Sequence, residues 1–593
     1  MGRFVLALQR DSYSSIISSR SGAAINSAQP AEGAANKRRK RARSYILALG
    51  PLIAAFAVGC SAPSHGLVGS APGPAETPQA AATQPAAAAP TTPAAETEVA
   101  PNRSALAQPA AATDESGEPS AEAKIDSPDS ETEASEPAEA PAAPADDKPR
   151  LYAPQGLVKI HQKADRDSPV IGAFRAGQSV VMTDTTLTKL RERRRLFQCT
   201  EGWYPVQPRG FVCVGGPKHA TRDGNDPRVL AARTVLPDTT ANYPFRFGVS
   251  VGSPQYLRIP TAAEQHQTEP DLDKHLANLP AADDAKGGAV NATPTGRPPS
   301  KALLRYLAST KLELVHKEKI FTGKKVAWAQ EFDAQGRTWL LTADLTLIPK
   351  DTVRTKPLPT LQGIDLRANP DVKLPLAFFW LTDSPKYRIG EDGKAFKTDE
   401  LWKRHSFVAA TTEMARGPGG YYWKLRNGDL VKYQDVTIIK KGRRPRGVGP
   451  TDKWMEARVT WGFLIAYEGD EPVYVTAMSP GIDGVNKRKH ATARGRHFID
   501  WKMLSSDMSG TEKRKFWFVD EVPWVAYYKG NYAVHGAWWH NDFGRPKSHG
   551  CVNLPPADAR FLFGWMDPVI PEGWYAASSY YPYTKGTLIF IHS

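Results

Sequence analysis

Short runs of alternating apolar and polar residues recur through most of the chain after residue 150. Residues 157–182 alternate in this way around turns at residues 165–169 and 176–177, and residues 202–206 and 210–214 continue the pattern. Runs of this kind, bounded by Gly, Pro, Asp and Ser, predict β-strands. The first part of the folded chain is therefore expected to be built from short strands.

Helical periodicity is rare by comparison. The clearest case is residues 555–565, where two prolines suit a helix start and Ala557, Phe561, Leu562 and Trp565 recur at helical spacing. With many strand patterns and one short helix, the chain is expected to be mostly β. At 593 residues it is too long for one domain, so three or four folded units are expected.

The middle of the chain, residues 217–450, is the hardest part to interpret. Residues 261–301 are polar and rich in Pro, Ala and Asp, which predicts a long loop or linker. Residues 304–349 and 374–441 each alternate apolar and polar positions and end in similar strand pairs. This weak internal similarity fits two further small barrels or one larger irregular β-domain, and the sequence leaves both open.

The first 149 residues carry export and tether signals. A basic stretch at residues 37–41 precedes an apolar run at 45–58, which has the size of a secretory signal rather than of a membrane span. The run ends in Ala-Val-Gly-Cys60, which resembles the lipobox of bacterial lipoproteins. Ordinary signal cleavage or an uncleaved anchor remain alternatives. Lipidation of Cys60 would attach the mature chain to a membrane surface.

Residues 61–149 contain mainly Ala, Pro, Thr, Ser and Glu, with almost no large apolar side chains to bury. Such a segment does not offset the entropy of ordering, so a disordered, extended tether is expected. A leader at residues 1–60 followed by this tether predicts a periplasmic lipoprotein, held at the outer membrane.

The formal net charge is +14, and because the tether is acidic the folded part is more basic still. The nucleic-acid-binding motifs that would turn this charge into a nucleic-acid prediction are missing from the sequence. A basic surface suits other anionic polymers equally well. Charge alone does not identify the partner.

The strongest chemical signal is Ser-His-Gly-Cys-Val-Asn at residues 548–553, with His535 sixteen residues before Cys551. A thiol is mostly protonated at neutral pH, so a nucleophilic cysteine needs an imidazole nearby to give thiolate. Gly550 leaves the neighbouring backbone N–H groups free to approach a substrate oxyanion. A buried structural cysteine in a small-residue turn is the alternative interpretation.

The surrounding sequence favours catalysis, because residues 522–554 resemble the L,D-transpeptidase catalytic domain, also called the YkuD domain. The family pattern is His-Gly or His-Ser at a strand end, a loop, and then Ser/Thr-His-Gly-Cys-x-Asn/Arg. Residues 454–481 resemble the two opening strands of that domain. Residues 492–498 resemble its Thr-Pro-x-Gly-x-Phe segment, with Ala493 in place of the proline. The resemblance covers residues 451–593 and implies a β-sandwich with one short helix.

The resemblance also implies roles for individual residues. Cys551 would be the nucleophile, His535 the general base and acid, and the Gly536 carbonyl the group that orients the imidazole. The backbone N–H groups of Gly550 and Cys551 would stabilise the oxyanion. The remaining residues expected to shape the turn and pocket are Ser548, His549 and Asn553, and His540 is expected to be a loop residue.

The implied reaction is acyl transfer on peptidoglycan stem peptides, which needs no metal or organic cofactor. Cys551 would attack the carbonyl after the L-centre of the position-3 diamino acid, and an amine would resolve the thioester into a 3-3 cross-link. An envelope protein is another possible acyl acceptor, and water would make the enzyme an L,D-carboxypeptidase or endopeptidase. A papain-like endopeptidase is disfavoured, since only His592 follows Cys551. A non-catalytic peptidoglycan-binding lipoprotein remains an alternative.

Residues 150–216 resemble a bacterial SH3-like barrel, with a Gly-Trp-Tyr-x-Val pair at 202–206 and a Gly-Phe-Val strand at 210–212. Cys199 and Cys213 flank this expected hairpin. In an exported protein, two cysteines on adjacent strands most simply form a disulfide. A zinc site would need two more ligands nearby, and the sequence offers none at suitable spacing.

Overall fold

The computed structural model describes residues 147–184, 199–216, 218–279, 299–309, 312–317, 319–482, 490–512, 514–579 and 585–593. The expected signal, the lipidation site at Cys60 and almost all of the tether therefore lie outside the described residues. In the part that is described, strands dominate and helices are few and short, so the fold is mostly β, as the sequence predicted. No helix among these described residues is long and apolar enough to cross a membrane.

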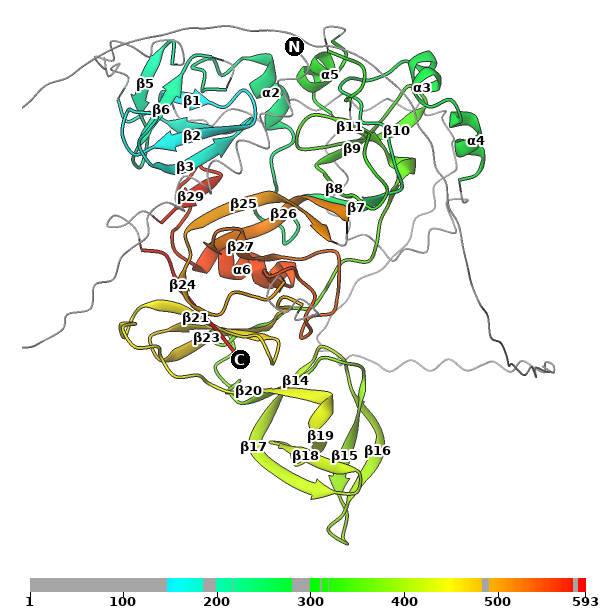
Figure 1. The fold of residues 1–593 in the computed structure, drawn as a ribbon, viewed down its shortest axis with the longest axis vertical. Coiled ribbons are helices and arrows are strands. Elements are labelled where there is room, and N and C mark those ends of the chain that lie inside the picture. The colour runs from blue at the N-terminus through cyan, green and yellow to red at the C-terminus, as the bar shows by residue number, and fades with distance from the viewer. Residues whose placement is uncertain are drawn as a thin grey trace, which may run out of the picture. The chain divides into compact units, whose positions relative to one another are not determined.

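The N-terminal unit, residues 150–214, is built from six short strands around a small apolar core (Figure 1). β2 pairs with β3 and β5 pairs with β6, while β1 pairs with β4 in a separate two-stranded sheet. Their bounds are β1 (Arg150–Tyr152), β2 (Leu157–His161), β3 (Val170–Arg175), β4 (Ser179–Val181), β5 (Gly202–Pro205) and β6 (Phe211–Val214).

The second unit, residues 227–354, combines six strands with four short helices. It includes residues 261–301, for which a loop or linker was expected. The first part of that expectation was wrong, because residues 262–268 and 272–277 form two helices, while residues 280–298 lie outside the described residues. Thr261 and Glu264 explain the first one: the Thr261 hydroxyl accepts from the Glu264 N–H, and the Glu264 carboxylate accepts from the Thr261 N–H. The elements are α2 (Pro227–Arg233), β7 (Arg246–Ser250), α3 (Ala262–Thr268), α4 (Leu272–Ala277), α5 (Lys301–Leu307), β8 (Lys325–Trp328), β9 (Gln330–Ala334), β10 (Arg337–Leu341), β11 (Leu347–Pro349) and β12 (Val353–Arg354).

The third unit, residues 374–441, is a curled sheet in which β14 pairs with both β17 and β20. Preceding it, β13 (Ile364–Asp365) pairs with a strand of the C-terminal domain. The strands of the third unit are β14 (Leu376–Phe379), β15 (Ser384–Ile389), β16 (Ala395–Trp402), β17 (Phe407–Gly417), β18 (Gly420–Leu425), β19 (Leu430–Lys432) and β20 (Val436–Ile439).

The C-terminal domain, residues 452–592, packs two sheets with a helix between them. The sequence suggested two opening strands, but there are three, since Gly469 at φ +59° turns the chain back between β22 and β23. The elements are β21 (Lys453–Arg458), β22 (Phe463–Glu468), β23 (Glu471–Ala477), β24 (Gly495–Phe498), β25 (Trp501–Glu512), β26 (Lys515–Lys529), β27 (Tyr532–Gly536), β28 (Val552–Leu554), α6 (Pro556–Trp565), β29 (Ala576–Ser578) and β30 (Leu588–His592).

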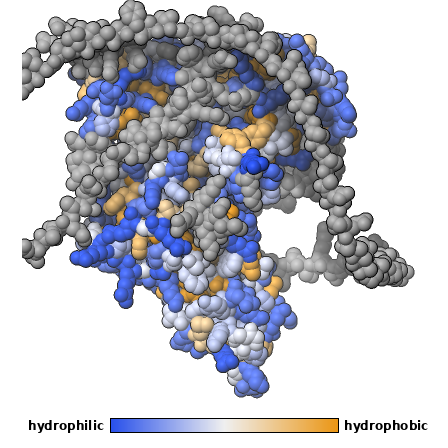
Figure 2. Space-filling model, in the orientation of Figure 1, coloured by the Kyte–Doolittle hydropathy of each residue, from blue (hydrophilic) through white to orange (hydrophobic). Residues whose placement is uncertain are grey.

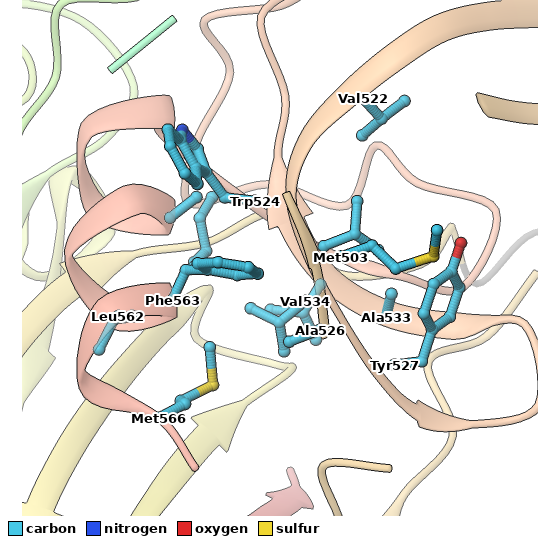
Figure 3. Packing of buried hydrophobic residues seen from close by; sticks show 14 of the residues in the cluster. Met503, Val522, Trp524, Ala526, Tyr527, Ala533, Val534, Leu562, Phe563 and Met566 are labelled. Carbon is cyan, nitrogen blue, oxygen red and sulfur yellow. The ribbon is translucent and has the colours of Figure 1, made fainter. Parts of the chain in front are cut away.

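Helix α6 forms where the proline pair and the apolar spacing predicted it. Figure 3 shows Phe563 of α6 extending towards Val534 and Ala526, on strands β27 and β26. All three side chains are at most 5% exposed. Burying a Phe or Val side chain stabilises a fold by about 1.5–3 kcal/mol. The helix therefore fixes the strands that carry the candidate site.

One sheet runs through three parts of the chain. β8 of the second unit joins β26, and β3 of the N-terminal unit joins β29. Beside the second junction, Arg175 donates to both carboxylate oxygens of Glu521, at 2.5 and 2.8 Å, and to the Tyr575 hydroxyl. The C-terminal domain is thus tied to the N-terminal unit by paired backbone and by a buried, bidentate ion pair.

The visible surface is largely polar. In Figure 2, hydrophilic residues cover most of the face that is not grey, with hydrophobic residues scattered between them. This agrees with the high content of Lys and Arg in the sequence.

Candidate active site

Strands β27 and β28 carry the two residues expected to react. They pair in parallel, with Val534 opposite Val552 and His535 opposite Asn553. Cys551 immediately precedes β28. Extending the register by one residue places it opposite Ala533, which lies two residues before His535 on β27. The thiol and the imidazole therefore arise from adjacent strands, near the edge where β27 ends. In this conformation the thiol donates to the Asn531 carbonyl, with sulfur and oxygen 3.7 Å apart.

His535 has a defined tautomer. Its Nδ1 lies 3.0 Å from the carbonyl oxygen of Gly536, and a carbonyl only accepts, so Nδ1 carries the proton. Nε2 is left with its lone pair, which is the state that a general base requires. The side chain is 2% exposed, and burial lowers the pKa of His535 to about 4. The imidazole is therefore neutral at pH 7.

A nearby imidazole was expected to convert the Cys551 thiol to thiolate, but the thiol is protonated at neutral pH. Burial raises the pKa of Cys551 to about 11, and a hydrogen bond from the backbone of Ala533 only partly opposes this. The physical reason is that His535 is also buried and neutral, so it supplies no positive charge to stabilise a thiolate. At rest, the thiol and the imidazole on the adjacent strand are therefore both neutral.

The Ser548–Cys551 turn is braced by one hydroxyl. Ser548 Oγ donates to the Cys551 carbonyl at 2.6 Å and accepts from the Gly550 N–H at 3.1 Å. Gly550 has φ +132°, and a Cβ there would lie 2.4 Å from the Tyr532 ring, so only glycine fits. The Gly550 amide is occupied by Ser548 in this conformation.

Asn553, opposite His535 in the register, is held by contacts with Ser479 and His540. Its backbone exchanges hydrogen bonds with Ser479 at 2.8 and 3.0 Å, and its side-chain nitrogen lies 3.1 Å from His540 Nε2. The Oδ1 atom of Asn553 is buried without a partner in the described structure. His540 was expected to be an ordinary loop residue, but it contacts the residue opposite His535. Burial lowers the pKa of His540 to about 4.

His549 points to a different part of the domain. Its Nε2 lies 3.0 Å from a carboxylate oxygen of Glu512, and its ring stacks on Trp517 with centroids 5.1 Å apart. Both partners belong to the β25–β26 hairpin. These contacts engage the His549 ring with the hairpin, whereas His535 lies in the strand beside Cys551.

Two tyrosines near the thiol were not anticipated. A register shift between Tyr527 and Lys529 inserts Tyr528 as an extra residue in β26. The Tyr527 hydroxyl lies 3.0 Å from Ser506 Oγ, whereas the Tyr528 hydroxyl is buried without a partner among the described residues. Burial raises the pKa of both phenols, and a charge on Cys551 would raise it further. Strand alternation does not reveal a bulge, so the sequence pattern could not place these hydroxyls.

Cys199 and Cys213 form a disulfide, with Cα atoms 5.5 Å apart. Their sulfurs and a ring nitrogen of His219 lie within 4.8 Å of one another. Because the two sulfurs are bonded to each other, they provide no thiolate to hold a metal. Cys199 and Cys213 therefore form a covalent cross-link within the N-terminal unit.

The domain thus has a helix between two sheets, and a cysteine turn that leads into the strand paired with that of a buried histidine. A family model described as "L,D-transpeptidase catalytic domain", YkuD, matches residues 452–592. Residues 452–592 are therefore similar to the YkuD-type L,D-transpeptidase catalytic domain. A search of curated proteins finds no match.

Solved L,D-transpeptidases align with the chain at low identity. One from Xylanimonas cellulosilytica is 22% identical over 25% of this chain and 65% of that one, with a TM-score of 0.17. One from Mycobacterium smegmatis is 18% identical over 39% and 88%, with a TM-score of 0.19. The catalytic domain from Enterococcus faecium is 18% identical over 24% and 98%, also with a TM-score of 0.19. The chain thus spans slightly under two thirds of the Xylanimonas chain.

Proposed function

We propose that this protein is a peptidoglycan L,D-transpeptidase in which Cys551 is the nucleophile and His535 the general base. The observation that carries the proposal is the similarity to a YkuD-type domain, combined with His535 on β27 and Cys551 immediately before the paired strand β28. The substrate is a stem tetrapeptide, cleaved after the L-centre of the position-3 diamino acid.

The first half of the reaction follows from the protonation states. His535 Nε2 takes the thiol proton as the Cys551 sulfur attacks the substrate carbonyl, and the resulting oxyanion faces the Cys551 N–H. The carbon–nitrogen bond to the terminal D-alanine then breaks, and the imidazolium returns its proton to the departing amine. A thioester on Cys551 remains. Cys551 and His535 are both neutral before the reaction. Charge develops only when the thiol proton moves to His535, after the substrate has displaced water from the site.

In the second half, an amine on a neighbouring stem attacks the thioester and gives its proton to His535. The new amide is a 3-3 cross-link, and the thiol is restored when the carbon–sulfur bond breaks and the proton returns to sulfur. An envelope-protein lysine resolves the same thioester in the same way and yields a protein attachment. Water resolves it to a free acid, which is the carboxypeptidase alternative.

The location is part of the proposal. Lipid on Cys60 holds the mature chain at the membrane, and residues 61–149 give the folded part the reach to meet the peptidoglycan layer in the periplasm. The basic composition of the folded part supports an encounter with the carboxylates of stem peptides.

The experiment is incubation of the purified chain with disaccharide-tetrapeptide, followed by mass spectrometry of the products. The proposal predicts loss of D-alanine together with a cross-linked dimer, and neither product with Cys551→Ala. Free tripeptide without dimer would indicate the carboxypeptidase. Unchanged turnover by Cys551→Ala would exclude Cys551 as the nucleophile, and no turnover by the wild-type chain would favour a non-catalytic binding protein.

A further inference from the structure

The loop that joins β27 to the cysteine turn, residues 537–547, is in contact with the third unit. We call it the catalytic loop, because it connects His535 to Ser548. Phe543 at its centre is fully buried in a core that also contains Phe378 of β14 and Phe463 of β22. The core of the third unit and that of the catalytic domain are therefore continuous at this loop.

Arg404 of the third unit makes the polar contact. Its guanidinium donates to the Asn541 carbonyl at 2.7 Å and lies 3.4 Å from a carboxylate oxygen of Asp542. The same side chain donates to the Trp380 carbonyl within its own unit. A hydrogen bond from a charged donor to a backbone carbonyl restricts the loop directly, since it does not depend on a loop side chain. Arg404 thus connects the third unit to the backbone of the catalytic loop.

A second contact lies further along the loop. The Arg545 guanidinium sits over the Trp380 ring, 4.7 Å from its centroid. Gly544 passes so close that a Cβ there would lie 2.8 Å from the Trp380 side chain. Its N–H donates to the Met478 carbonyl in the catalytic domain. The catalytic loop is therefore held between the two parts at both of these points.

The contacts lead from Arg404 to the residue opposite His535. The Asp542 N–H donates to His540 Nδ1 at 3.3 Å, and His540 Nε2 lies 3.1 Å from the Asn553 side chain. Ser479 Oγ also donates to the Asp542 carbonyl at 3.0 Å. Displacing Asp542 would therefore change the support of Asn553, which pairs with His535 across β27 and β28.

We propose that the third unit is a positioning module for the catalytic loop, with Arg404 as the positioning residue that keeps His540 against Asn553. The expected change in acylation rate rests on the proposed function, whereas the expected change in hydrogen exchange of the catalytic loop does not. It assigns the third unit a role in the rate of acyl transfer that does not require the unit to bind peptidoglycan.

The test compares full-length Arg404→Ala with Lys403→Ala, its neighbour on the same turn. Lys403 pairs with Asp383 within the third unit and is 76% exposed, so it is a matched control. Acylation by a carbapenem is followed by intact mass over a range of inhibitor concentrations. Arg404→Ala should lower the maximal acylation rate about tenfold and leave the half-saturating concentration unchanged, while Lys403→Ala should match wild type. Arg404→Lys, which keeps one donor, should recover part of the rate.

Hydrogen exchange supplies a readout that does not depend on activity. Peptides covering residues 537–547 should exchange faster in Arg404→Ala than in Lys403→Ala, with other core peptides unchanged. Arg404→Met, which keeps the aliphatic length of the side chain but removes its donors, should give the same pattern if Arg404→Ala folds poorly. Equal rates and equal exchange in the Arg404 and Lys403 variants would overturn the proposal.

Two further outcomes separate the alternatives. If Arg404→Ala raises the half-saturating concentration at unchanged maximal rate, Arg404 binds substrate and is not a positioning residue. If wild type forms no adduct on Cys551, the proposed function fails. The exchange comparison still decides whether Arg404 holds the loop in that case.

Discussion

Cys213 and Cys551 both lie at strands that pair with a neighbour, but their sulfurs have different surroundings. Cys213 lies on β6 and is bonded to Cys199, which precedes β5 in the N-terminal unit. Cys551 is the free cysteine among the described residues, and it immediately precedes β28, which pairs with the strand of His535. Position at a strand pair therefore does not decide the chemistry of a cysteine: a second thiol within bonding distance gives a disulfide, and an imidazole on the adjacent strand gives a candidate nucleophile.

The largest expected effect comes from removing the free thiol. Cys551→Ala should abolish formation of the cross-linked dimer from disaccharide-tetrapeptide, because no thioester can form. The double variant Cys199→Ser/Cys213→Ser should retain the rate of wild type under conditions in which it is folded. Product masses from both variants check this. Comparable losses in the two would mean that the two regions are not functionally distinct.

Removing the base should give the next largest effect. His535→Gln should slow acylation about 10²- to 10⁴-fold, the range typical of general acid–base catalysis. His549→Ala should have a much smaller effect, because that ring is engaged with Glu512 and Trp517 on the hairpin. Single-turnover rates for the two variants provide the comparison. A larger loss in the His549 variant would reverse the assignment of the base.

The disulfide should matter for stability rather than for rate. It closes a loop with a sequence separation of 14, for which the chain-entropy estimate is about 3 kcal/mol of unfolding free energy. Cys199→Ser/Cys213→Ser should lower the unfolding free energy of the N-terminal unit by about this amount in a urea titration. No change in the transition would show that the bridge is not a stabilising staple.

The last expected effect is on the reactivity of Cys551 as a function of pH. A thiol whose pKa is raised to about 11 is protonated below that value, so its alkylation rate should rise about tenfold per pH unit from pH 7 towards 11. Iodoacetamide labelling of Cys551, measured by mass, checks the slope. A rate already constant from pH 6 would show a preformed thiolate–imidazolium pair instead of the neutral pair described above.

Local sequence patterns predicted the parts of the site that lie close together along the chain. The Pro555–Pro556 pair and the apolar spacing after it predicted α6, the strand-end histidine lies on β27, and the cysteine turn leads directly into β28. The capping pair Thr261 and Glu264 was an available signal for α3 that polar composition concealed. Short helices of this kind need such end signals, because their apolar faces are too small to recognise.

Contacts between distant segments could not be predicted. Arg175 and Glu521 are 346 positions apart, and nothing in either local pattern selects the other. The same is true of Arg404 and the catalytic loop, which are joined only through folding. His540 looked like a loop residue because its partner, Asn553, follows a turn of unpredictable shape. The long-range contacts that support the site were therefore missed, and the roles of Cys551 and His535 stay predictions.

The central claim is that Cys551 is the acylated residue, and the most direct measurement is covalent labelling by a carbapenem. The full-length chain is incubated with the inhibitor, its intact mass is recorded, and the adduct is located by peptide mapping. The account predicts one adduct, on the peptide that contains Cys551, and none in Cys551→Ala. An adduct on Cys199 or Cys213, or an adduct that persists in Cys551→Ala, would contradict it.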